Sequence, residues 1–65
     1  MWVPFDGLSD FLAQDDVFLL SVHGLNTVYS HDNGYSIIRR VGNEVSIFET
    51  DFADSQIAQQ HAIDF

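Results

Sequence analysis

The sequence predicts an α+β fold, in which an antiparallel meander of three to four strands is flanked by a short N-terminal helix and a C-terminal helix. Apolar and polar residues alternate over residues 35–50 around the dipeptide Gly42-Asn43, which is typical of a hairpin with a two-residue loop. Apolar residues instead recur at helical spacing in residues 8–12 and 53–65. A chain of 65 residues is expected to form a single compact acidic domain over residues 1–65.

The first helix is expected to end near Gln14, because Asp15-Asp16 would be unfavourable at the negative end of the helix dipole. Either Asp6 or Ser9 is the expected cap, since a short polar side chain can accept hydrogen bonds from the free N–H groups of the first turn. The apolar residues of this helix share one face: Leu8, Phe11 and Leu12.

The strands of the meander follow this helix. Residues 17–22 form an apolar and β-branched run that predicts a buried strand. A tight turn at His23-Gly24 would then allow residues 25–30 to pair back onto it. The next turn is predicted at Asp32-Asn33-Gly34, because Asn and Gly tolerate positive φ. The hairpin over residues 35–50 completes the meander.

The last helix is predicted to begin at the cap Asp51, with Asp54 three residues on in the pattern of a capping box. Its core-facing stripe is expected to consist of Ala53, Ile57, His61 and Phe65, widened by Ala58 and Ala62. Both helices are expected to pack on the same face of the sheet. The expected core consists of Phe11, Leu12, Phe18, Leu20, Val28, Ile37, Val45, Ile47 and Ile57.

The charge balance is the most unusual feature of the composition. Ten carboxylates stand against two arginines, with no lysine and no cysteine, for a net charge of −8. Direct binding to nucleic acid or to anionic lipid needs a basic surface, so we expect neither. The longest apolar run, residues 17–20, is far shorter than the roughly 20 residues that span a bilayer. A complete small reading frame without a signal peptide, and a cytoplasmic location, are therefore expected.

No pattern in the chain predicts an enzyme, and we expect no catalytic residue, no cofactor and no metal. Ser21, His23 and Asp32 supply the residue types of a hydrolytic triad, but no nucleophile elbow or oxyanion-hole pattern surrounds the serine. His23 and His31, together with Asp32, supply the ligand types of a metal site, but their spacing matches no zinc signature. We interpret both histidines as turn and strand residues, and His61 as a partly buried core residue.

Arg39 and Arg40 form the only cationic pair, and in a strand they point to opposite faces. Cross-strand pairing of one of them with Glu44 or Glu49 is expected. The alternative is that one arginine anchors an interface with a partner, because arginine is enriched at binding hot spots.

Acidic residues that border the first helix and the start of the last helix are the candidate partner-binding residues. Each would accept hydrogen bonds from Lys or Arg of a basic partner. They are Asp6, Asp10, Asp15, Asp16, Glu44, Glu49, Asp51 and Asp54. Residues i and i+2 of a strand, or i and i+4 of a helix, are about 6–7 Å apart, similar to phosphates along DNA. Glu49/Asp51 and Asp6/Asp10 are thus predicted to have phosphate-like spacing.

In size, charge and α+β pattern, the whole chain resembles the small inhibitors that bacteriophages encode against host nucleases, including anti-CRISPR proteins and DNA-mimic antirestriction proteins. The resemblance implies an inhibitor of a larger protein with a basic surface, such as a nuclease or CRISPR effector, that acts in the host cytoplasm. It assigns no individual residue. The alternatives are a homodimerising or docking module whose acidic surface serves only solubility, and adaptation of the surface to high salt.

Overall fold

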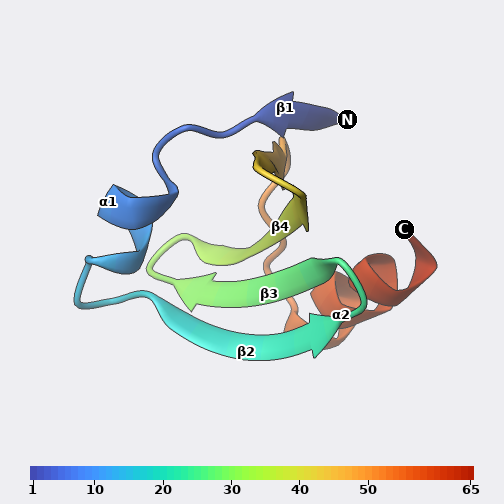
Figure 1. Cartoon of the computed structure of the whole chain (residues 1–65). Helices are drawn as coiled ribbons and strands as arrows, with labels where there is room; N and C mark the ends of the chain where they lie inside the picture. The colour runs from blue at the N-terminus through green and yellow to red at the C-terminus, as the bar shows by residue number, and fades with distance from the viewer.

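The computed structural model describes residues 1–65 as one antiparallel five-stranded sheet and two helices (Figure 1). The elements are β1 (Trp2–Pro4), α1 (Leu8–Leu12), β2 (Phe18–His23), β3 (Asn26–His31), β4 (Gly34–Val41), β5 (Glu44–Phe48) and α2 (Ser55–Asp64). The strand order is β1-β5-β4-β3-β2, so β2 to β5 form a sequential meander and β1 adds to the outer side of β5. The predicted α+β class is confirmed. The fifth strand is an addition that the sequence did not predict.

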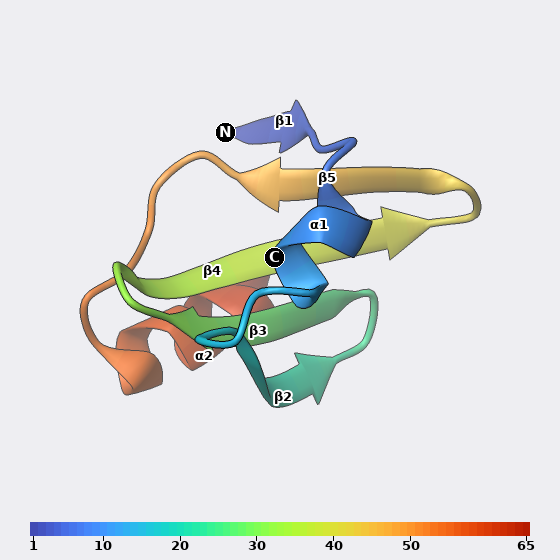
Figure 2. The same ribbon diagram turned by 90° about the vertical axis from the view of Figure 1, so that its left-hand side faces the viewer.

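The two helices cover opposite faces of the sheet (Figures 1 and 2). Val28 of β3 packs with Ala58 and Ala62 of α2, whereas the ring of the next residue, Tyr29, lies 5.7 Å from that of Phe11 of α1. Since successive side chains of a strand point to opposite faces, the prediction that both helices share a face is wrong. β1 and β2 lie at opposite edges, so the connection that contains α1 must cross one whole face, and α2 occupies the other.

The buried core is small and lies under α2. It consists of Val28, Ile37, Ala58 and Ala62, with Trp2, Tyr35, Phe48 and Phe52 packed around it. Ile38 is buried on the α1 side. Val28 and Ile37 confirm the prediction. Three further predicted core residues are only half-buried: Phe11, Val45 and Ile47. Four are exposed, against the prediction: Leu12, Phe18, Leu20 and Ile57.

The position of α2 follows from its cap. Asp54, not Asp51, caps the helix, and its Oδ1 accepts hydrogen bonds from Gln56 N at 2.8 Å and Ile57 N at 3.2 Å. The predicted stripe is also wrong, because the two alanines face the sheet while Ile57 and His61 are exposed. Methyl side chains let the helix approach the sheet closely, and the His61 ring instead stacks on Phe52 at 5.0 Å.

Three local predictions at the N-terminal half also need correction. The N-cap of α1 is Gly7 with no side-chain hydrogen bond, so neither Asp6 nor Ser9 caps it. The first hairpin turns at residues 24–25, one residue later than predicted, because Gly24 adopts φ +61° and His23 still pairs with Asn26. β2 is an exposed edge strand, not a buried one. The turn before Gly34 and the Gly42-Asn43 hairpin are confirmed.

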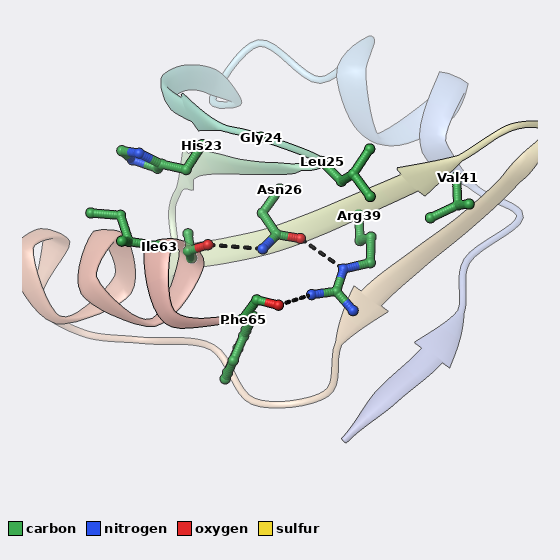
Figure 3. A pocket seen from close by; sticks show the side chains of 9 residues that line it. His23, Gly24, Leu25, Asn26, Arg39, Val41, Ile63 and Phe65 are labelled. Atoms are coloured by element: carbon green, nitrogen blue, oxygen red, sulfur yellow. Dashed lines mark hydrogen bonds between the residues drawn. The ribbon is translucent and has the colours of Figure 1, made fainter.

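A buried asparagine ties the end of α2 to the sheet (Figure 3). Asn26 Nδ2 donates to the Ala62 carbonyl at 2.8 Å, and its Oδ1 accepts from Arg39 Nε at 2.9 Å. Arg39 Nη2 also donates to the Phe65 main-chain oxygen at 2.8 Å, and its guanidinium lies 4.3 Å from the Trp2 ring centroid. No Asp or Glu side chain pairs with either arginine, so the predicted cross-strand ion pair is wrong; the strand partners are Ser46 and Val45.

Replacing Asn26 with alanine is expected to lower the free energy of unfolding by about 2 kcal/mol, because the Ala62 carbonyl and Arg39 Nε each lose a buried partner. Urea unfolding measures this change. Asn43→Ala, at an exposed turn position with no side-chain hydrogen bond, is the matched control and should change stability by less than about 0.5 kcal/mol. Equal effects of the two variants would contradict the anchoring role.

Candidate functional site

Carboxylates from both halves of the chain line two hollows. Asp16 and Asp51 line one of about 290 Å³ on the side of the sheet that α1 covers, and Asp6 and Glu44 line another of about 330 Å³ beside the paired strands β1 and β5. Each hollow joins one carboxylate from the α1 region with one from the β5 region. We call the exposed surface that runs along the α1 segment and includes both hollows the acidic face, and it consists of Asp6, Asp10, Asp15, Asp16, Glu44 and Asp51.

The acidic face is positioned by one aromatic anchor. The ring of Phe11 meets the rings of Phe5, Tyr29 and His31 edge-on, with centroids 5.8, 5.7 and 5.9 Å apart. Edge-to-face contacts at such distances stabilise a pair by about 0.5–1.5 kcal/mol beyond the area that they bury. Because α1 has only five residues, this packing holds the segment on the sheet far more than helix propensity does.

The carboxylates of the acidic face fall into two groups. Two of them are engaged within the chain: Asp16 Oδ2 accepts from the main-chain N of Asp32 at 3.2 Å, and Asp51 Oδ1 accepts from Ser36 Oγ at 2.8 Å. The other four are exposed and make no hydrogen bond or ion pair within the chain: Asp6, Asp10, Asp15 and Glu44. These four are free to accept hydrogen bonds from a cationic partner.

Asp51 belongs to a hydrogen-bonded chain with Ser36 and His31 that the sequence did not predict. His31 Nε2 lies 2.6 Å from Ser36 Oγ, and His31 Nδ1 accepts from the main-chain N of Asn33 at 3.2 Å. Since Nδ1 is an acceptor, the neutral ring carries its proton on Nε2 and donates it to Ser36, whose hydroxyl then donates to Asp51. An activated serine needs a free imidazole lone pair, which is lacking here. The chain therefore ties β3 and β4 to the segment before α2.

The other chemical groupings that the sequence suggested are not assembled. Ser21 Oγ and His23 Nε2 are 3.0 Å apart, but Asp32 lies at the opposite end of the hairpin. His23 and His31 are likewise separated by the length of β3, which is about 17 Å at about 3.4 Å per residue. No group of three or more His, Asp or Glu side chains is arranged to hold a metal ion. His23 and His31 are therefore too far apart to bind one metal ion together.

Two predicted partner-binding residues lie outside the acidic face. Glu49 Oε1 is 3.3 Å from the Met1 amino group, and Asp54 caps α2. The phosphate-like spacing expected for Asp6/Asp10 and Glu49/Asp51 assumed that each pair lies within one helix or one strand. Asp6 precedes α1 and Asp51 follows the end of β5, so regular helix or strand spacing applies to neither pair.

Comparison with family models, with curated proteins and with solved structures finds no match to this chain. Neither α1 nor α2 is long and apolar enough to cross a membrane. The function of the chain is therefore inferred from its own surface.

Proposed function

We propose that this chain is a non-enzymatic binding protein that inhibits a nucleic-acid-handling protein by occupying its basic surface. The observation that supports this proposal is the acidic face, which unites carboxylates from the α1 and β5 regions. The partner that fits it is a nuclease or CRISPR effector with a Lys- and Arg-lined channel. The proposed place of action is the cytoplasm, the host cytoplasm if the chain is phage-encoded.

Charge makes such a partner favourable. The acidic face has six carboxylates, whereas the chain has only one exposed arginine, Arg40, because Arg39 is half-buried and engaged with Asn26. A one-signed surface speeds association with an oppositely charged channel. Carboxylate oxygens accept the same charge-assisted hydrogen bonds from Lys and Arg that phosphates accept.

The size of the molecule limits the form of inhibition. The chain measures 27 × 27 × 18 Å, and 27 Å corresponds to about eight base pairs of duplex at about 3.4 Å each. One copy would therefore block part of a channel and compete with the nucleic acid directly. Because the carboxylates have no regular spacing, the proposal concerns competition for basic residues and not an imitation of the phosphate ladder.

Pull-down against a panel of nucleases and CRISPR effectors tests the proposal. Binding is expected at about 50 mM salt and should fall steeply at about 500 mM, where screening shortens the reach of surface charges. Added DNA should compete. Binding that is indifferent to salt, or binding to none of the panel, would contradict the proposal.

A charge-matched pair of variants locates the surface. Asp10→Asn with Asp15→Asn removes two unpaired carboxylates of the acidic face and should weaken binding about tenfold, or about 1.4 kcal/mol. Glu49→Gln with Asp54→Asn removes the same charge elsewhere, and Asn retains the capping ability of Asp54. This control should change affinity less than twofold. The alternative, a module whose charge serves only solubility, predicts that both variants keep every association.

A further inference from the structure

The two edges of the sheet are built differently. β1 has three residues and ends in Pro4, which cannot donate to a further strand, so this edge is short and protected. β2 has six residues and contains no proline, lysine or acid, and its outer backbone groups face no other strand. A β-bulge between Leu19 and Ser21 is its only irregularity. An edge of this kind is open to pairing with another strand.

Large apolar side chains are concentrated along the same edge. Five of the eleven exposed large hydrophobic residues lie in residues 18–25. Phe18, Leu19, Val22 and Leu25 are 65%, 59%, 58% and 61% exposed, and Leu20 is 40% exposed. Apolar patches of this kind on small proteins mark interaction sites.

Charge indicates what could cover this edge. Residues 17–31 carry no Asp, Glu, Lys or Arg, although the whole chain has a net charge of −8. Two copies would repel one another over most of their surface, but not here. The carboxylates that flank this stretch, Asp16 and Asp32, lie together at the Phe18 end of β2. Antiparallel pairing of two β2 strands would place these groups more than about 17 Å from their counterparts, beyond the screening length of about 8–10 Å.

We propose that β2 joins β2 of a second copy in an antiparallel two-fold dimer with one continuous sheet. Residues that face one another across such a pair must point to the same side of the sheet. Phe18 and His23 point to the α2 side, and Leu19 and Val22 to the α1 side, because the bulge shifts the alternation by one residue. A two-fold axis between Leu20 and Ser21 meets this condition, since it sets Leu19 opposite Val22 and Phe18 opposite His23.

In this register, a side chain of the second copy also fills the largest hollow of the molecule. The hollow has a volume of about 590 Å³, lies beside His23 on the α2 side and is lined by Gly24, Leu25 and Ile63 (Figure 3). Its buried polar groups on Asn26 and Arg39 already have partners within the chain. In the dimer, Phe18 of the second copy lies against this hollow. The exposed ring and the hollow are thus complementary features of two identical surfaces, as a two-fold interface requires.

Sedimentation velocity over about 1 µM to 1 mM tests the dimer directly. The wild-type chain is expected to move from 7.4 kDa towards twice that mass as its concentration rises. Val22→Lys should raise the dimer dissociation constant at least about tenfold, because it places an ammonium group from each copy in the apolar interface between the two β2 strands. Ile57→Lys is the control: Ile57 is similarly exposed, and it lies one helical turn before His61, on the Phe52 side of α2 and away from β2.

Circular dichroism of both variants shows whether each remains folded. A wild-type chain that stays monomeric over the whole range would overturn the proposal. So would two folded variants that weaken association equally, because both add the same charge. The dimer does not depend on the acidic face, so the Asp10→Asn/Asp15→Asn variant should dimerise like the wild type whether or not the proposed function holds.

Discussion

Replacing Ile37 with alanine is expected to lower the free energy of unfolding by about 3 kcal/mol or more, since truncating a buried isoleucine costs about 2–5 kcal/mol. Ile37 of β4 is fully buried beneath α2, where it belongs to the small core with Val28, Ala58 and Ala62. A domain of 65 residues has roughly 3–10 kcal/mol in total. The substitution should therefore remove a large part of the stability of the chain.

Ile57 supplies a control with the same side chain. It belongs to the stripe that the sequence predicts as core, yet it is 53% exposed on α2. Ile57→Ala should change stability by less than about 0.5 kcal/mol. Thermal unfolding by circular dichroism should show a fall of at least about 10 °C for Ile37→Ala and almost none for Ile57→Ala. The reverse order would mean that α2 faces the sheet with its larger residues.

Replacing Gly34 with alanine is expected to cost about 3 kcal/mol, by combining backbone strain with the loss of hydrogen bonds. Gly34 has φ +122°, and an added Cβ would lie 2.3 Å from the Phe52 carbonyl oxygen. That oxygen accepts from Tyr35 N at 2.8 Å, and Phe52 N donates to the Tyr35 carbonyl at 2.8 Å. The new methyl group would push apart the bridge that brings the chain from β5 to α2.

Gly24→Ala is the control that separates the effect of backbone strain at a positive φ from the effect of the steric clash with Phe52. Gly24 also has positive φ, at +61°, but nothing lies within 4 Å of its missing Cβ. This substitution should cost only the left-handed conformation itself, about 1–2 kcal/mol. Urea unfolding of both variants measures the difference. Similar losses would show that the close approach of Phe52 to Gly34 contributes little.

The strands were the most predictable part of the fold. In residues 35–48 the period of two and the turn residues determine both register and facing, and neither depends on distant parts of the chain. α2 was predicted as a helix, but its inward face was not. Helical spacing predicts that the row with the largest residues, such as Ile57, faces the sheet. The alanines face it instead, because α2 packs closely against β3 and β4. This close packing depends on the tertiary structure and cannot be predicted from the spacing of residues within the helix.

β2 shows a different limit of sequence reasoning. A run such as residues 18–22 is apolar on both faces, which is typical of a buried strand in the interior of a sheet. An edge strand that pairs with another chain has the same composition. Only the strand order, which leaves β2 at the edge, distinguishes the two cases.

The candidate site was predictable as a set of residues but not as a surface. Charge counting identified all six members of the acidic face, together with Glu49 and Asp54, which lie elsewhere. Which carboxylates belong to the acidic face depends on their distances from one another in the folded chain. Those distances depend on how the α1 segment crosses the sheet. The hydrogen bond between Ser36 and Asp51 could not be predicted for a similar reason, because it depends on the path of the chain after β5.

The outer position of β1 has a consequence for the order of folding. The pairing of Trp2 with Phe48 joins residues 46 positions apart (48 − 2), whereas β2 to β5 are linked through two-residue turns. Closing a long loop costs more entropy than closing a short one, so the local hairpins can form before the N-terminal strand finds its place. Until then, β5 remains a second open edge, and Trp2 lacks its contacts with Phe48 and Phe65. We therefore expect β1 to pair last, after the meander of β2 to β5 has formed.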